Sequence, residues 1–278
     1  MNKKIILICT ICCGLAISGC NKASKNDAKA EVANTPVVKQ DTLVAAPTKN
    51  TPEQILAKPE VPVLCYHRIT EGHEGTYTVT PATFAAHMKI LADSGYHSIS
   101  PDQLYDYLVY NKNLPEKPFM ITFDDSRVEH SEIAAPTMEK YGFRGVFFIM
   151  TITYNKKNYM TTDQIAQLAK NGHTVGMHSW DHTMVTKYKD SIDWQKEVVA
   201  PKAKLETIIG KPVEYWAYPN GVYNHEGAEE LSKYFKISFI LSSKRDSIQP
   251  LQTVHRMITT ECSPEKLLKT MNQTFKMK

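Results

Sequence analysis

Short apolar runs alternate with segments of helical periodicity from residue 59 to the end of the chain. The apolar runs predict seven strands, at 61–66, 119–123, 145–150, 174–177, 214–218, 237–241 and 253–258. The intervening segments predict helices at 81–94, 101–110, 131–141, 163–171, 194–209, 226–235 and 264–271. Glycines follow four of these helices, where a left-handed residue often ends a helix: Gly95, Gly142, Gly172 and Gly210.

Strands that alternate with helices indicate a parallel sheet with right-handed crossovers. Nearly continuous apolar runs such as 146–150 fit strands that are covered on both faces. The pattern therefore predicts an α/β protein with one catalytic domain, a distorted (β/α)7-type barrel. In such barrels the functional groups gather at the carboxyl ends of the strands.

The first twenty residues have the features of an export signal. Lys3 and Lys4 precede an apolar stretch at 5–17, which is shorter than the roughly 20 residues that a spanning helix needs. Residues 17–20, Ile-Ser-Gly-Cys, resemble a bacterial lipobox, so Cys20 is the expected lipidation site. A plain signal peptide and an N-terminal anchor helix are the alternatives. The lipobox predicts an exported lipoprotein, anchored to a membrane of the cell envelope by its lipid.

Composition divides the chain into a leader at 1–19, a tether at 20–58 and a catalytic domain at 59–278. The tether lacks aromatic residues and has no sustained periodicity. Loss of Lys3 and Lys4 with the leader lowers the formal net charge from +4 to +2. This balance argues against a nucleic-acid binder, and we expect a monomer. Whether Cys65 and Cys262 form a disulfide or remain free thiols is left open.

Several chemically reactive side chains directly follow predicted strands. His67 follows the first strand, Asp124 and Asp125 follow the second, and His178 and His182 follow the fourth. A parallel barrel would bring them to one rim, where two carboxylates and three imidazoles suit a divalent metal and acid–base chemistry. The two histidines would share one face if their segment is a helical turn. Each pair is a weak signal alone, and the joint placement is what favours a site.

Three motifs resemble those of the polysaccharide deacetylases, the carbohydrate esterase family 4 or NodB-homology domain. They lie at 122–126 (TFDDS), 178–182 (HSWDH) and 217–221 (AYPNG). The opening 63–69 (VLCYHRI) is similar to the branch that deacetylates poly-β-1,6-N-acetylglucosamine. The resemblance covers 61–258 and implies hydrolysis of N-acetyl groups on an N-acetylglucosamine polysaccharide, with peptidoglycan or chitin-like oligomers as other candidates.

The resemblance also implies residue roles. Asp125, His178 and His182 would hold the metal, and Asp124 would be the general base. Zinc is the expected ion because it accepts histidine and carboxylate ligands, with Co²⁺, Ni²⁺ or Mn²⁺ as alternatives.

The third motif would supply the oxyanion donor, a backbone N–H near Asn220 after Pro219. Among the aromatic residues near the rim, Trp180 and Tyr218 are the expected substrate contacts. Three further aromatic residues are weaker candidates for stacking on sugar rings: Tyr66, Trp216 and Tyr223.

Two departures from the family pattern bear on these roles. Ala217 stands at or near the position of an arginine that orients the base, and Arg256 is the expected substitute. The usual carboxyl-terminal histidine acid has no match at the right spacing. In the branch that deacetylates poly-β-1,6-N-acetylglucosamine, the Tyr-His of the first strand supplies this group, so the resemblance implies that His67 is the acid, with His255 as the alternative.

Two other classes of function remain as alternatives. A non-catalytic glycan-binding lipoprotein on this fold would more often have lost a metal ligand. A glycoside hydrolase needs two carboxylates roughly 5–9 Å apart across the scissile bond, which the adjacent Asp124 and Asp125 cannot readily provide.

Overall fold

A computed structural model describes residues 48–72 and 76–276. Its main sheet follows the order β10-β9-β8-β7-β6-β5-β1-β11, and every strand pair in it is parallel. These strands are β1 (Val63–Tyr66), β5 (Pro118–Phe123), β6 (Val146–Ile149), β7 (Thr174–Met177), β8 (Tyr215–Ala217), β9 (Ile237–Ile240), β10 (Val254–His255) and β11 (Met257–Ile258). The predicted barrel of parallel strands is confirmed, and it is nearly closed.

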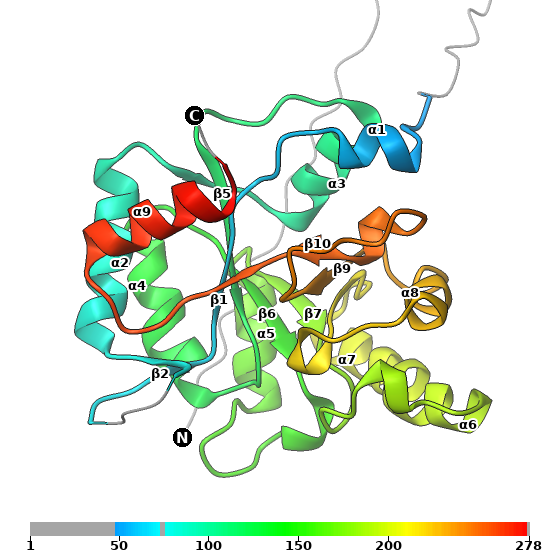
Figure 1. The fold of residues 1–278 in the computed structure, drawn as a ribbon. Coiled ribbons are helices and arrows are strands. Elements are labelled where there is room, and N and C mark those ends of the chain that lie inside the picture. The colour runs from blue at the N-terminus through cyan, green and yellow to red at the C-terminus, as the bar shows by residue number, and fades with distance from the viewer. Residues whose placement is uncertain (1–47, 73–75, 277–278) are drawn as a thin grey trace, which may run out of the picture. The chain divides into compact units, whose positions relative to one another are not determined.

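Helices surround the barrel, and α9 packs beside α2 on one side of it (Figure 1). The α-helices are α1 (Pro52–Leu56), α2 (Pro81–Asp93), α3 (Pro101–Tyr110), α4 (Ala135–Glu139), α5 (Thr162–Lys170), α6 (Ser191–Trp194), α7 (Ala200–Ile209), α8 (His225–Leu231) and α9 (Pro264–Thr274). Shorter helical turns are η1 (His130–Ala134), η2 (Thr151–Thr153), η3 (Val185–Lys187), η4 (Gln195–Val199), η5 (Pro219–Gly221) and η6 (Pro250–Gln252). All seven predicted helices therefore have a counterpart.

The last predicted strand is divided between two neighbours. Its first half, β10, pairs with β9, and its second half, β11, pairs with β1. Arg256 lies between the halves, and its N–H donates to Ile240 O at 3.1 Å. This segment therefore bridges the first and last strands of the barrel, and it carries Arg256 at the crossing.

Alternating side chains of the strands divide the core in two. Leu64 and Tyr66 belong to a cluster shared with helices such as α2 and α9, whereas Val63 and Phe148 belong to a separate cluster. The second cluster includes Leu104 of α3 and Ile55 of α1. Since successive side chains of a strand point to opposite faces, the second cluster fills the barrel interior.

Glycine ends four helices as predicted. The residues are left-handed, with φ of 75° at Gly95, 72° at Gly142, 88° at Gly172 and 65° at Gly210. At α3, the Ser100 side chain accepts a hydrogen bond from Gln103 N–H, and proline occupies the first turn. These local signals explain why the helix ends were predictable.

The folded unit begins before the expected boundary at residue 59. Helix α1 lies inside the segment assigned to the tether, with Thr51 and Gln54 forming a reciprocal cap. Ile55 is buried, and Asn50 N–H donates to Val109 O at 2.8 Å. The expected end of the tether at 58 is therefore wrong, because one buried side chain and one cap hold this short helix on the domain.

The expected leader and the lipidation site Cys20 lie outside the described residues and stay predictions. Within 48–72 and 76–276, no helix is long and apolar enough to cross a membrane. Three very short strands were not anticipated, namely β2 (Arg68–Ile69), β3 (Thr78–Val79) and β4 (His97–Ser98). Among the described cysteines, Cys65 and Cys262 are both free.

Candidate metal and acid–base site

Asp124 directly follows β5 and is almost wholly buried. Arg256 donates to both of its oxygens, from Nη1 to Oδ1 at 2.7 Å and from Nη2 to Oδ2 at 2.8 Å. Burial acts to raise the pKa of Asp124, but the charge and hydrogen bonds of Arg256 together with the charges of His178 and His67 outweigh it, and the pKa lies well below its usual range. Asp124 is therefore an ionised carboxylate held by a two-point ion pair.

Asp125, His178 and His182 form a compact cluster beside Asp124. Asp125 Oδ1 lies 3.6 Å from His178 Nε2 and 3.7 Å from His182 Nε2. Their ligand atoms all fall within 4.8 Å of one another. Two imidazoles and a carboxylate at this spacing form a donor set that suits zinc with an open coordination position.

The hydrogen bond on His178 supports this fit. Its Nδ1 lies 2.8 Å from the carbonyl oxygen of Ala217, so Nδ1 carries the proton and Nε2 presents a lone pair toward Asp125. Burial lowers the pKa of His178, against the effect of the nearby carboxylates, which favours the neutral form that binds metals. For ligands about 2.0–2.1 Å from a tetrahedral ion, the ligand atoms would be about 3.3 Å apart, close to the observed spacing.

The segment between the two histidines is not the helical turn that their spacing suggested. It is a bend in which Ser179 and His182 have left-handed backbones, with φ of 63° and 73°. Ser179 Oγ accepts a hydrogen bond from His182 N–H at 2.8 Å, which closes the bend. The imidazoles still meet, with ring centroids 4.9 Å apart, because the bend reverses the chain.

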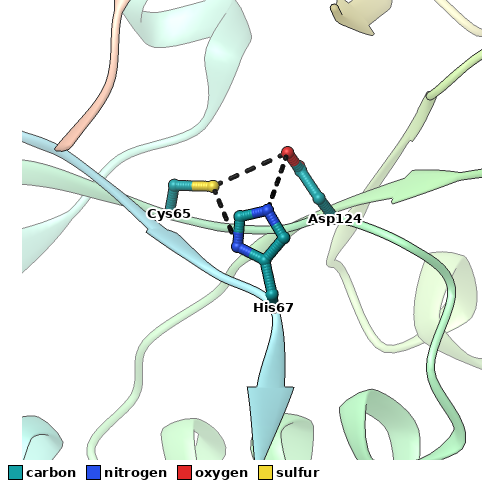
Figure 2. Close-up of side chains that lie close together, drawn as sticks. All are labelled: Cys65, His67 and Asp124. Carbon is teal, nitrogen blue, oxygen red and sulfur yellow. Dashed lines mark hydrogen bonds and ion pairs between the residues drawn. The ribbon is translucent and has the colours of Figure 1, made fainter. Parts of the chain in front are cut away.

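His67 lies at the end of β1 on the other side of Asp124. Its Nε2 is 4.0 Å from Asp124 Oδ2, and its Nδ1 is 3.8 Å from Cys65 Sγ (Figure 2). The alternative acid, His255, packs against Phe275, and its Nδ1 is 3.6 Å from Glu60 Oε2. Of the two histidines, His67 is the one beside the buried aspartate.

Asn220 lies in η5, at the expected oxyanion segment. Gly221 N–H donates to Tyr218 O at 2.8 Å, and Asn220 occupies the exposed position of this turn with φ of 59°. Pro219 before it is buried. Gly221 contacts Leu241 so closely that a Cβ there would lie 2.4 Å from the Leu241 Cβ, so the turn requires glycine.

The exposure of the predicted aromatic residues shows which of them can contact a sugar. Tyr66, Trp216 and Tyr218 have no exposed surface, so the expectation that they stack on sugars is wrong and they belong to the core. Trp180 and Tyr223 are partly exposed. Trp180 has the ammonium of Lys196 4.5 Å from its ring centroid, which covers one of its faces.

Two residues of the site were not predicted from sequence. Cys65 lies two positions before His67, and that spacing could have placed both side chains together. Tyr77, half exposed, has its ring centroid 5.2 Å from that of His67. No sequence signal indicated Tyr77, because the two-residue strands β2 and β3 that bring it there are too short to predict.

Comparisons with known proteins find similarity to polysaccharide deacetylases. A family model described as polysaccharide deacetylase matches residues 111–234. YxkH of Bacillus subtilis (strain 168), named as a candidate polysaccharide deacetylase, is 29% identical over 174 residues, which are 63% of this chain and 61% of that protein. The chain thus spans less than two thirds of the length of this relative.

Solved structures share the fold. The deacetylase PplD of Streptococcus pyogenes, in complex with acetate, aligns with a TM-score of 0.70 and 22% identity over 81% of this chain and 99% of its own. A polysaccharide deacetylase from Bacillus cereus aligns at 0.67 with 25% identity over 76% and 69%. IcaB from Ammonifex degensii aligns at 0.65 with 24% identity over 78% and 98%. The chain is thus similar to polysaccharide deacetylases over residues 111–234, and it shares the fold of these solved structures.

Proposed function

We propose that this domain hydrolyses N-acetyl groups of an N-acetylglucosamine polysaccharide and depends on a divalent metal, most favourably zinc. The observation that carries the proposal is the placement of two chemically different carboxylates on one rim. Asp124 is paired with Arg256, whereas Asp125 faces the nitrogens of His178 and His182. This division separates an acid–base group from a metal-binding group.

Asp124 acts as the general base in this proposal. Its Oδ2 lies 3.9 Å from His178 Nε2 and 4.0 Å from His67 Nε2, so this oxygen lies between the two imidazoles. Arg256 fixes the carboxylate and keeps it ionised, ready to accept a proton from the attacking water. The low pKa makes Asp124 a weak base. A divalent metal held by the neighbouring cluster would compensate, since it lowers the pKa of water and polarises the acetamide carbonyl.

His67 acts as the general acid. Its side chain is 15% exposed, so one edge of the ring can reach a substrate while the other faces Cys65. It delivers the proton that the leaving sugar amine requires. The backbone N–H of Asn220 is the proposed donor to the oxyanion, and partly exposed Trp180 is the proposed sugar contact.

Poly-β-1,6-N-acetylglucosamine is the substrate we favour. The support is the sequence around Tyr66 and His67 and the position of His67, rather than His255, beside Asp124. Acetate release should be compared among β-1,6 oligomers, β-1,4 oligomers and peptidoglycan. Faster turnover of β-1,4 oligomers or peptidoglycan would overturn this preference while leaving the deacetylase assignment intact.

The central test compares two neighbouring aspartates. Asp125→Ala should lose bound metal and acetate release together, because it removes one of three ligands. Asp124→Asn should retain metal but lose turnover at least about 100-fold, the usual scale for a missing general base. Metal content, thermal unfolding and acetate release should be measured in each. Asp93→Asn, at an exposed residue paired with Lys89, is the matched control.

Chelation of the metal should abolish acetate release, and added zinc should restore it. Stoichiometric metal without acetate release from any of these substrates would contradict the proposed hydrolysis. Glycan binding that survives Asp124→Asn in such a protein would instead indicate a non-catalytic glycan-binding domain.

A further inference from the structure

Cys65 is a buried thiol that the proposed mechanism does not use. It lies on β1 with no exposed surface, and it faces the space between His67 and Asp124 (Figure 2). Its Sγ is 3.6 Å from Asp124 Oδ2 and 3.8 Å from His67 Nδ1. The thiol therefore contacts both residues to which we assign proton transfer.

The surroundings of Cys65 favour a protonated thiol. Burial raises its pKa well above the usual value, and the positive charge of Arg256 does not offset this effect. Arg256 also occupies both oxygens of Asp124. A thiolate that binds a second metal with Asp124 and His67 is thus disfavoured, and the S–H group is available as a hydrogen-bond donor.

The thiol of Cys65 can link His67 and Asp124 by two hydrogen bonds, one that it donates and one that it accepts. The S–H donates to Asp124 Oδ2, and the sulfur accepts from a protonated His67 Nδ1. In that arrangement His67 Nε2 points away from the sulfur, and it is the nitrogen that lies 4.0 Å from Asp124 Oδ2. The sulfur therefore constrains the ring orientation of His67 and the position of the basic oxygen together.

We propose that Cys65 is a positioning residue that couples the acid His67 to the base Asp124 through its S–H group. The inference rests on the proposed function. It assigns a role to the thiol that neither metal binding nor packing requires, since a carbon side chain could fill the same volume.

The test uses the full chain with three substitutions. Cys65→Ala should lower kcat about tenfold while KM changes less than about twofold, because the substrate does not touch the sulfur. Cys65→Ser retains a donor and should keep kcat within about threefold of the unmodified protein. Cys262→Ala is the matched control, because Cys262 is a second free cysteine whose sulfur lies beside His87, 3.7 Å from its Nε2, rather than beside Asp124.

Metal content and thermal unfolding separate this role from others. All three variants should bind the same amount of metal as the unmodified protein. A serine variant as impaired as the alanine variant, or an alanine variant with normal kcat, would overturn the inference. If Cys65→Ala bound one metal equivalent less than the unmodified protein, the inference would also be overturned, because the sulfur would then be a metal ligand.

An infrared measurement tests the hydrogen bond without any activity. The S–H band that disappears in Cys65→Ala should lie at lower frequency in the folded protein than in urea, because donation to a carboxylate weakens the S–H bond. An unshifted band would refute the coupling even if the protein were inactive. Normal activity together with an unshifted band would refute this inference alone and leave the proposed function in place.

Discussion

Residues with left-handed backbones concentrate at the site. Among the residues that the structure describes, ten non-glycine residues have a positive φ, and five of them lie at the site: Asp125, Ser126, Ser179, His182 and Asn220. Non-glycine residues hold this conformation only where their surroundings compensate, and such strain collects at functional sites. Here the compensation is visible, since Ser126 Oγ accepts from Met150 N–H at 2.7 Å and Ser179 Oγ accepts from His182 N–H at 2.8 Å. The loops that present the site side chains are therefore held in place by their own serines.

The Asp124–Arg256 pair leads to a prediction at the level of single residues. Arg256→Met should lower the free energy of unfolding by about 3–5 kcal/mol, because it leaves a buried carboxylate without its partner. Asp124→Asn combined with Arg256→Met should cost less than the sum of the two single substitutions. Urea unfolding of the four proteins measures this coupling. Strictly additive losses would contradict a buried ion pair.

The residue roles could be anticipated only in part from sequence. Arg256 was expected near the base because a barrel brings strand ends together, although 132 positions separate it from Asp124. The neutral tautomer of His178 could not be predicted, because it depends on the carbonyl of Ala217 in a neighbouring strand. The burial of Tyr66, Trp216 and Tyr218 in the core could not be predicted either. An aromatic side chain near a strand end can point toward the core or toward the rim.

At the scale of elements, the sequence predicted most strands and helices to within a few residues. The strand at 174–177 was predicted with the bounds that β7 has in the structure. Proline caps and terminal glycines marked the helices, and these signals are local. The division of the last strand into β10 and β11 could not be predicted. The chain pairs with β9 before Arg256 and with β1 after it, and this change of partner exists only when the barrel closes.

Gly176 in β7 permits a close approach that a larger residue would prevent. A Cβ at this position would lie 2.6 Å from the Phe148 ring and 2.9 Å from Tyr215 O. Gly176→Ala should therefore lower the free energy of unfolding by about 1–3 kcal/mol through overpacking. It should also lower metal affinity, because β7 leads directly into His178. Zinc titration and urea unfolding measure the two effects.

Gly95→Ala is the control for this substitution. No atom lies within 4 Å of its Cβ position, but its φ of 75° is left-handed. We expect a loss of about 1 kcal/mol from backbone strain and no change in metal affinity. Equal metal affinity in both variants would show that β7 tolerates displacement at Gly176.

At the scale of the whole domain, the barrel topology explains why a site spread over the sequence could be anticipated at all. Parallel strands end on one rim, so His67, Asp124 and His178 were expected together before any distance was known. The amino-terminal boundary was less predictable. Helix α1 has five residues and one buried side chain, Ile55, and so short a segment has almost no periodicity to detect.

Buried histidines give the domain a predictable response to acid. Burial lowers the pKa of His87, His130 and His173, in each case against hydrogen bonds that favour the charged form. In the unfolded chain a histidine titrates near its ordinary value of about 6.5. The unfolded state therefore binds more protons than the folded state once the pH falls below that value. The stability from these groups is fully present above about pH 6.5 and is lost as the pH falls toward their folded-state pKa values.

We therefore expect the urea midpoint of the metal-free protein to be level between pH 8 and 7 and to fall steadily between pH 6.5 and 5. Each histidine contributes a slope of up to about 1.4 kcal/mol per pH unit. His87→Gln can keep its hydrogen bond to Cys262 O but cannot titrate, so it should reduce this slope. A midpoint that stays constant down to pH 5 would mean that these histidines take up protons without unfolding, and the burial argument would then fail for this domain.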